Sequence, residues 1–568
     1  MNLVLLSGVL VGEGLKMGYN KDEFSEDEKK IVSPFFTNLD KQVFVLKNIP
    51  QVVAGTLFSR YSRSAKPLRR LLLEDFIDKP EMGFDEIVGQ KEGGTEEIIA
   101  IKKAEEFYDR VLVDFGDDSV AELGGAHVGC EQVSNIAAKA LEDSRIGISP
   151  LEKSTRYIYF HKKVGGNYQY YRPEKIMNSE FAKEYERLCD ELFGIYEENL
   201  DKMKECLMKK FPQTNDLSDR AYNSTIKAKV CDVLRVFLPA GTLTNLGLYG
   251  NGRAFEYLIT KMKANELEEV RSLGNLMQEE LSKVIPSFVK RATEEDVFGK
   301  GNISFLREIN AGMKKLAKET VEGIESDSGQ EVVLVKYDED AVEKVLAGMI
   351  YPYTDLSFEQ VLEKVKGLNE KERKKLIDVQ LSGRRNRRHK PGRGFELANY
   401  TFDILGNYGI YRDLQRHRML TQQKQDLTVK HGFDVPEELE LIGLTEKYKE
   451  MMKKVEKFYW KIFEKFPKEA QYVVPFGYKI RWHITINARA LYHFVELRSV
   501  AAGHSDYRII AQEMYLKAKA VHPTLFEWAK FVDLKNYDLE RVESEKGIDR
   551  KIEVVKKKYE KQRESRIS

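Results

Sequence analysis

The strongest constraint on the fold is an internal repeat. The segment 238–258 runs in step with the segment 474–494, and each holds a proline twelve residues before the asparagine of an Asn-x-Arg triplet. Each copy continues as an amphipathic helical stretch that ends near a further proline. The matched residues are Pro239, Asn251 and Pro286 in the first copy and Pro475, Asn487 and Pro523 in the second. We therefore expect two copies of one module in tandem.

The repeat also suggests where the chain divides. A weaker echo of the segment 53–64 at 346–357 extends the repeat toward the start of each copy. A chain of 568 residues is too long for one hydrophobic core. We place the two halves at 1–310 and 320–568, and expect the lysine- and glutamate-rich stretch 311–340 to be a solvated connection or a peripheral hairpin. The first half carries extra sequence at 213–229.

Strand-like and helical patterns occur in both halves. The runs 156–160 and 480–486 predict strands, whereas 179–212 and 444–466 predict long charged helices. The C-terminal stretch from residue 538 alternates in charge and predicts a solvated helix. Together these patterns predict the α+β class.

Charge and cysteine usage exclude several classes of protein. The chain has 92 basic and 91 acidic residues, and this balance argues against a general nucleic-acid or membrane-surface binder, although local patches are allowed. Its four cysteines include no CxxC pair, which disfavours a zinc site or a disulfide framework and favours a reducing, cytoplasmic setting. No run is apolar enough to span a bilayer, and the apolar start is expected to be a strand or core segment rather than a signal peptide.

The triplet Arg416-His417-Arg418 is the most distinctive local feature. It follows an apolar, aromatic stretch, 395–414, that we expect to be buried. Neighbouring side chains on a helix point about 100° apart, so the three cannot share one face. They either extend into solvent at a helix end or surround an anion. The basic run 383–393 just upstream also has two interpretations: it is either a solvated loop or a cover for a phosphate.

The triplet and its surroundings resemble the signature of the flavin-dependent thymidylate synthases, the ThyX family. That signature is R-H-R, then a serine, then Glu-x-Ser-x-Arg-Tyr. The second half holds the triplet with Thr421 in the serine place, but departs from the rest with Lys424, Asp426, Thr428 and Val429. The first half departs from the triplet with Ser144, Arg145 and Ile146, but retains Ser149, Glu152, Ser154, Arg156 and Tyr157. Each copy thus keeps the part that the other has lost.

The resemblance implies two tandem ThyX-like domains, each a mainly antiparallel sheet with long packed helices. It implies FAD as cofactor, held by Arg416, His417, Arg418, Glu396, Arg393, Ser119, Glu122 and Ser62. It also implies a nucleotide substrate, held by Glu152, Ser154, Arg156, Arg489, Arg253 and Asn487. Outside the signature, Ser154 would be taken for a cap or turn residue, and Arg253 and Arg489 for partners in ion pairs. No metal site is predicted.

The activity implied by the resemblance is C5 methylation of dUMP with methylenetetrahydrofolate and reduced FAD, with NADPH as a candidate electron source. Family sites lie between the subunits of a tetramer. We therefore expect a homodimer that mimics that tetramer, with the two signature halves meeting at an interface and one FAD per chain. Two alternatives stay open. One is a flavoenzyme that modifies another pyrimidine nucleotide or one-carbon acceptor, and the other is an inactive nucleotide-binding or scaffold paralogue.

Overall fold

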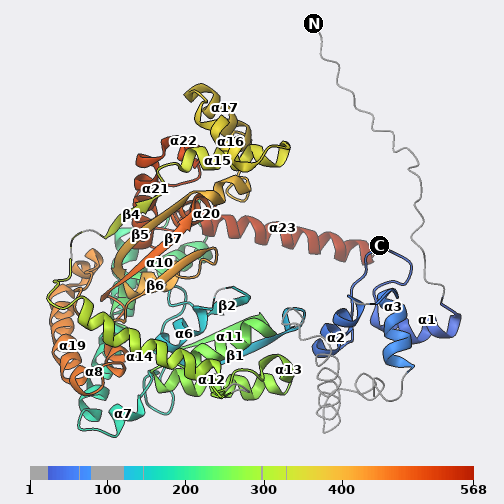
Figure 1. The fold of residues 1–568 in the computed structure, drawn as a ribbon. Coiled ribbons are helices and arrows are strands. Elements are labelled where there is room, and N and C mark those ends of the chain that lie inside the picture. The colour runs from blue at the N-terminus through green and yellow to red at the C-terminus, as the bar shows by residue number, and fades with distance from the viewer. Residues whose placement is uncertain are drawn as a thin grey trace.

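The computed structural model describes residues 24–62, 64–78, 121–144, 146–295, 299–327, 329 and 331–567. The expected strand or core segment at the start of the chain lies outside these residues. Figure 1 shows two sheets flanked by helices, with a helical group, α1–α3, to one side and a long C-terminal helix, α23, extending from the body. The helices and strands of the mixed fold confirm the α+β class.

The first half contains a three-stranded antiparallel sheet of order β1-β3-β2. Its strands are β1 (Gly125–Ser134), β2 (Ile148–Glu152) and β3 (Leu243–Asn251). Its helices are α1 (Glu26–Val32), α2 (Gln51–Tyr61), α3 (Leu68–Leu72), α6 (Asn135–Glu142), α7 (Glu174–Met177), α8 (Ala182–Glu198), α9 (Leu200–Lys210), α10 (Asp219–Leu234), α11 (Gly252–Lys263), α12 (Glu268–Ser282), α13 (Pro286–Val289) and α14 (Asn302–Thr320).

The second half contains a four-stranded antiparallel sheet of order β4-β5-β7-β6. Its strands are β4 (Val332–Tyr337), β5 (Asn399–Asn407), β6 (Leu420–Lys424) and β7 (Lys479–Asn487). Its helices are α15 (Ala341–Ile350), α16 (Phe358–Lys366), α17 (Glu370–Leu381), α18 (Tyr408–Leu414), α19 (Thr445–Lys465), α20 (Ala488–Arg498), α21 (Ser505–Val521), α22 (Pro523–Phe526) and α23 (Val542–Ile567).

The repeat predicted from the sequence is present in the structure. Asn251 ends β3 and caps α11 by accepting a hydrogen bond from the Ala254 amide at 2.8 Å. Asn487 ends β7 and caps α20 through the Ala490 amide at 2.9 Å. Each capping oxygen satisfies an amide that the first helical turn leaves without a partner. Both Asn-x-Arg triplets therefore mark a strand-to-helix junction.

The two copies pack around a local two-fold relation. Pro239 and Pro475, matched in the sequence, form an antiparallel bridge with each other. The Ala240 amide donates to the Val474 carbonyl at 2.8 Å, and the Phe476 amide donates to the Leu238 carbonyl at 2.9 Å. Such reciprocity, in which each copy offers the same segment to the other, is typical of a symmetric dimer interface. One chain thus has the arrangement of a dimer of two modules.

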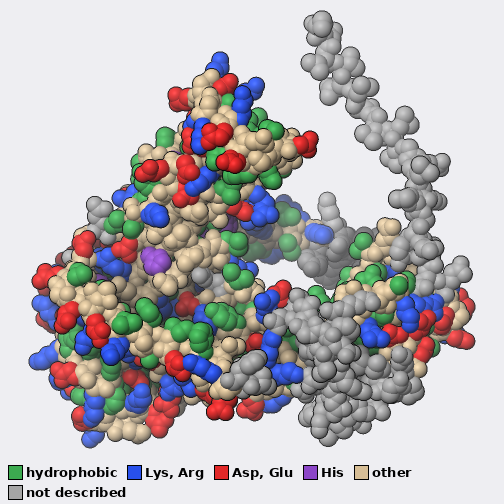
Figure 2. All heavy atoms as spheres, in the orientation of Figure 1, with side chains coloured by type: hydrophobic (Ala, Val, Ile, Leu, Met, Phe, Trp, Pro, Cys, Tyr) green, Lys and Arg blue, Asp and Glu red, His purple; other side chains and the backbone are tan. Residues whose placement is uncertain are grey.

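The helices α8 and α19, one from each copy, also pack against each other. They lie side by side in Figure 1, and ion pairs join Lys454 to Glu191 and Lys461 to Glu184 in the antiparallel sense. The helix expected at 444–466 is confirmed, whereas the one expected at 179–212 is two helices, α8 and α9, that meet at Asn199. Figure 2 shows basic and acidic side chains interspersed over one face of the molecule.

One local prediction is wrong. The run 156–160 is a turn and not a strand, because the Ser154 hydroxyl accepts a hydrogen bond from the Arg156 amide at 3.2 Å and stabilises a local turn. The stretch 311–340, expected to be a solvated connection or a peripheral hairpin, is solvated: its described residues from 311 to 331 are exposed. It also contains regular structure, since α14 continues to Thr320 and β4 begins at Val332. The β-branched run that begins β4 pairs with β5 and extends the second sheet. The strand expected at 480–486 is confirmed as β7.

Two further features concern the oxidation state of the cysteines and membrane-spanning helices. All four cysteines are free, and three of them are buried. Within the described residues, no helix has both the length and the apolar character needed to cross a membrane.

Candidate cofactor and nucleotide site

A cavity of about 440 Å³ opens beside the R-H-R triplet. Its wall is formed by the loop after α18 with the start of β6, the end of β7 and one face of α20 along its whole length, together with Lys390 and Glu396. Six of the residues predicted for cofactor or nucleotide line it: Arg416, His417, Arg418, Glu396, Asn487 and Arg489. The remaining lining residues are Lys390, Met419, Leu420, Ile486, Ala490, His493, Leu497 and Arg498.

The triplet reaches this cavity because a buried helix ends just before it. Helix α18 is buried through Tyr408, Ile410, Tyr411 and Leu414, as the apolar stretch 395–414 predicted. Asn407 caps its start through the Ile410 amide at 3.0 Å. The helix ends at Leu414, so the triplet follows a fixed element, and all three of its side chains line the same cavity. The interpretation as a solvated helix end is therefore disfavoured.

The lining of the cavity is strongly basic. Five cationic side chains face a single carboxylate, Glu396; the five are Lys390, Arg416, Arg418, Arg489 and Arg498. Glu396 is engaged by Arg489 at 2.9 Å. Burial, together with the charge of Arg416, holds the pKa of Arg498 below its usual value. An anion in the cavity would relieve this repulsion, and arginine forks bind phosphates through paired charge-assisted hydrogen bonds.

His417 is oriented by two neighbours. Its Nε2 atom lies 2.9 Å from the Arg498 Nε donor, so this nitrogen acts as an acceptor and carries no proton. Its ring lies 4.3 Å from the Phe494 ring, centroid to centroid. The imidazole thus has a fixed plane at the cavity wall.

The two halves of the signature meet within one chain. The Arg418 Nη2 atom donates to the Ser149 Oγ atom at 2.9 Å. Just before the triplet, Arg412 pairs with Glu152 at 2.8 Å and donates to the Thr155 hydroxyl at 3.1 Å. These contacts join residues about 260 positions apart in sequence. The segment that retains the triplet therefore lies against the segment that retains Glu-x-Ser-x-Arg.

Glu152 is neutralised inside this interface. Its second carboxylate oxygen accepts from Lys139 at 2.9 Å, and its side chain is 1% exposed. Burial raises the pKa of Glu152, but Arg412 and Lys139 outweigh burial and hold that pKa well below its usual range. Glu152 thus supports the join between the halves.

Arg156 is also paired within the chain. Its guanidinium donates to both oxygens of Asp232, with Nε at 2.8 Å and Nη2 at 2.7 Å, and both side chains are less than a tenth exposed. The Asp232 carboxylate occupies the fork that the resemblance assigns to a substrate phosphate. Ser154 lies beside this pair and forms the turn described above.

The other predicted residues do not line the cavity. Arg253 pairs with Glu122 at 2.7 Å, which matches in the first half the pairing of Arg489 with Glu396. Arg393 is 86% exposed and binds Glu396 from outside. Ser62 is the C-terminal cap of α2, and its hydroxyl donates to the Ser59 carbonyl at 2.7 Å. Ser119 and Arg145 lie outside the described residues.

Several residues of the site were not singled out from the sequence. Lys390 stands in the basic run 383–393 and was identified only as part of that run. His493, Lys139 and Asp232 had no sequence signal, because each is an ordinary helical residue whose partner is distant in the chain. Arg508, which follows the second Asn-x-Arg triplet, instead donates to the backbone carbonyls of Ser499 and Lys535.

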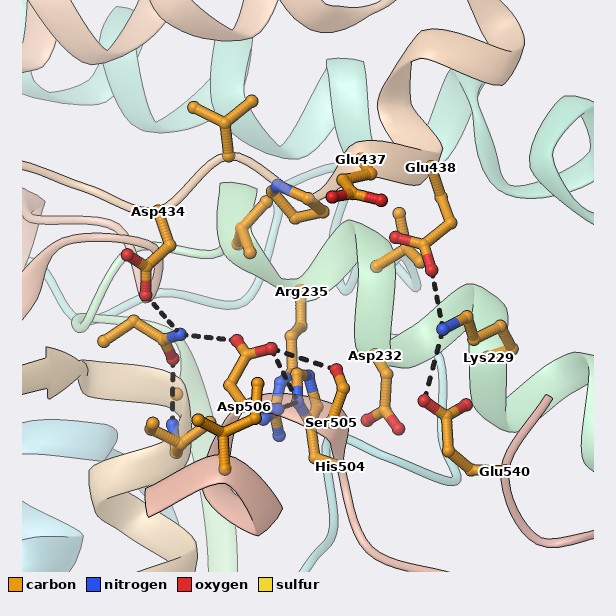
Figure 3. A pocket seen from close by; sticks show the side chains of 18 of the residues that line it. Lys229, Asp232, Arg235, Asp434, Glu437, Glu438, His504, Ser505, Asp506 and Glu540 are labelled. Carbon is orange, nitrogen blue, oxygen red and sulfur yellow. Dashed lines mark hydrogen bonds and ion pairs between the residues drawn. The ribbon is translucent and has the colours of Figure 1, made fainter. Parts of the chain in front are cut away.

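A larger cavity, of about 740 Å³, lies between the two halves and contains none of the predicted cofactor or nucleotide residues (Figure 3). Its three cations, Lys210, Lys229 and Arg235, are outnumbered by eight carboxylates: Asp232, Glu331, Asp434, Glu437, Glu438, Asp506, Asp538 and Glu540. Lys229 is held between Glu438 at 2.6 Å and Glu540 at 3.3 Å. A negative lining repels phosphate, so the smaller, basic cavity is the better candidate for a nucleotide.

The donor set of the basic cavity suits FAD and not a metal ion. Paired arginines match the pyrophosphate of a dinucleotide. Across the described ranges, no group of three or more His, Cys, Asp or Glu side chains is arranged to hold a metal.

Comparison with known proteins agrees with the repeat. The family described as thymidylate synthase complementing protein matches residues 80–287 and again residues 333–524. Each match covers one copy of the repeat and its sheet.

The relatives fall into two groups. A UPF0159 protein of Chlamydia pneumoniae is 43% identical over 92% of this chain and 98% of its own length. A UPF0159 protein of Thermoplasma acidophilum is 35% identical over 86% of this chain and 97% of its own length. A flavin-dependent thymidylate synthase of Sulfolobus acidocaldarius is 32% identical over 24% of this chain and 55% of its own length. Similarity over the whole chain is therefore to the UPF0159 proteins.

Proposed function

Because the chain belongs to the family of thymidylate synthase complementing proteins, we propose that it is a flavoenzyme that binds FAD in the basic cavity. The observation that carries this proposal is the gathering of Arg416, His417 and Arg418 with Asn487 and Arg489 around one cavity. Relatives named as flavin-dependent thymidylate synthases support the choice of cofactor.

The residues of the cavity have separate tasks in this proposal. Arg416 and Arg418 hold the pyrophosphate of FAD, and Glu396 keeps Arg489 in place. His417, unprotonated at Nε2, offers a flat surface for a ring. When bound and reduced, FAD supplies a hydride; the protein binds, orients and excludes water.

The reaction we propose is methylation of a pyrimidine nucleotide at C5, with dUMP as the first candidate, methylenetetrahydrofolate as one-carbon donor and NADPH as electron source. One such site per chain is expected, because only the second half retains the triplet. Pairing of two chains would give an assembly of four modules, and we keep 1–310 and 320–568 as the proposed domains. Free cysteines are compatible with a reducing, cytoplasmic location.

A second candidate is a flavoenzyme that acts on another pyrimidine nucleotide or one-carbon acceptor. The observation in its favour is the Arg156 fork, which Asp232 fills at 2.7–2.8 Å. A dUMP phosphate bound in the family manner would have to displace that carboxylate.

Flavin content and genetic rescue test the proposal. The purified protein is expected to be yellow with one FAD per chain, and replacing Arg416 and Arg418 together with alanine should abolish FAD retention without unfolding the protein. A matched control replaces Lys447 and Lys453, two exposed cations of α19, with alanine. Wild-type protein without flavin would refute the flavoenzyme proposal and favour an inactive paralogue. A double variant that keeps full flavin absorbance would refute the assignment of FAD binding to Arg416 and Arg418. Rescue of a thymidine-requiring strain separates dUMP methylation from the second candidate.

A further inference from the structure

A basic loop, 383–392, stands at the edge of the cavity between α17 and the 3₁₀ helix 393–397. We refer to it as the basic loop. It carries four exposed or half-exposed cations: Arg385, Arg387, Arg388 and Lys390. Lys390 lines the cavity itself. The loop therefore adds positive charge to a site that is already basic.

The basic loop is fixed to the body of the second half. Arg384 is 3% exposed and forms an ion pair with Glu496 of α20, whose side chain is fully buried. Arg384 also donates to the Trp528 carbonyl at 3.0 Å and, back within the loop, to the His389 carbonyl at 2.6 Å. Its guanidinium lies 5.0 Å from the centre of the Tyr492 ring. Because the loop is anchored in this way, its backbone loses little freedom when the exposed side chains bind a ligand.

The four cations of the basic loop have no acidic partners among the described residues. No ion pair joins any of them to a carboxylate, whereas Arg384, at the base of the same loop, is fully paired. The loop does fold around His389, whose ring lies within hydrogen-bond distance of the Arg385 amide and the Asn386 side chain. The fold of the loop is therefore stabilised by hydrogen bonds within it, whereas its four exposed or half-exposed cations form no ion pair with a described carboxylate.

The charge of the loop reaches the cavity. His493, a lining residue, has its pKa lowered first by burial and then by Lys390 and Arg387. Together the loop and the cavity wall carry eight cations: Arg385, Arg387, Arg388, Lys390, Arg416, Arg418, Arg489 and Arg498. Two carboxylates form ion pairs with members of this set, Glu396 with Arg489 at 2.9 Å and Asp413 with Arg416 at 3.5 Å. The pyrophosphate of FAD and one monophosphate supply about four negative charges. Such ligands would leave an excess of positive charge.

We infer that the acceptor nucleotide carries several phosphates and that the basic loop binds them. This inference rests on the proposed function, and it specifies the substrate class of that site. Asp232 already occupies the fork of Arg156, which the resemblance assigns to a single phosphate. The basic loop instead offers guanidinium groups without described carboxylate partners at the edge of the basic cavity, which Lys390 lines. The same phosphate chemistry has two sources, a free nucleoside triphosphate or the phosphodiesters of a single strand that contains the nucleotide.

The experiment compares three probes on the flavin-loaded protein: dUMP, dUTP and a fluorescently labelled oligo(dU) strand. The variant R385Q/R387Q/R388Q removes three charges, and K447Q/K453Q/K457Q on α19 removes three exposed charges elsewhere; Figure 1 places α19 and α17 at opposite ends of the second half. Affinity is measured over a range of salt. For the strand, three lost phosphate contacts should lower the slope of log affinity against log salt by about 2 and weaken binding about 100-fold near 0.1 M salt.

The outcomes separate the sources and the proposals. Loop-dependent binding of dUTP alone identifies a free nucleotide, and loop-dependent binding of the strand identifies nucleic acid; both support the inference. Preference for dUMP, equal effects of the two triple variants, or loss of FAD from the loop variant would overturn it. The last result would assign the basic loop to the flavin. Because FAD absorbance is recorded first, failure of the flavin assignment is seen independently of nucleotide binding.

Discussion

The pairing of Arg156 with Asp232 makes a quantitative prediction. Replacing Asp232 with asparagine keeps the shape of the side chain but removes the negative charge that pairs with the buried Arg156 guanidinium. The wild-type pair has three hydrogen bonds, at 2.7, 2.8 and 3.1 Å, and both side chains are less than a tenth exposed. Removing one charge of a buried ion pair lowers the free energy of unfolding by about 3–5 kcal/mol, because the other charge stays buried without a partner. We expect D232N to lose about that much free energy of unfolding.

The assay is denaturant unfolding with and without added inorganic phosphate. If the Arg156 fork is a phosphate site filled by Asp232, phosphate should stabilise D232N and leave the wild type almost unchanged. At about 100 times the dissociation constant, a ligand adds about 2.7 kcal/mol. The double variant R156M/D232L removes both charges and should recover most of the loss. A loss below about 1 kcal/mol in D232N, or equal stabilisation of both proteins by phosphate, would show that the pair does not stand in for a bound phosphate.

Three further predictions concern the interface between the two halves, the segment next to the cavity and the anchor of the basic loop. Glu152 has a pKa held below its usual 4.5, so its stabilisation is present above that pH and is lost as pH falls; E152Q should be less stable at neutral pH and show a flatter pH dependence of unfolding below pH 4.5. G394A places a methyl group 2.8 Å from the Val345 carbonyl oxygen, and should cost about 1–3 kcal/mol in thermal unfolding and reduce flavin retention. E496Q leaves Arg384 buried without a counter-charge, and should lower stability by about 3–5 kcal/mol and weaken dUTP binding, measured by calorimetry.

Much of the fold follows from patterns that are local in sequence. The Asn251 and Asn487 caps depend on contacts three residues away, and the buried strand β7 shows its alternation in nine residues. The repeat is also visible without coordinates, because matched positions keep their spacing. The turn at 156–158 was missed because aromatic residues predict a strand, while the Ser154 hydroxyl offers the backbone a competing partner.

The sequence alone determined that two modules stand in tandem, that the triplet ends a buried element, and that anion-binding residues of each copy complement those of the other. The tertiary structure decided which of these charges remain available. Glu152 and Arg156 carry the expected residue types, but Lys139, Arg412 and Asp232 neutralise them from elements that lie apart in the chain or belong to the other copy. Residue type determines what a side chain can donate or accept, and the sequence shows it directly. The partner is determined by tertiary packing, because a buried charge must be paired with a group that the fold brings next to it.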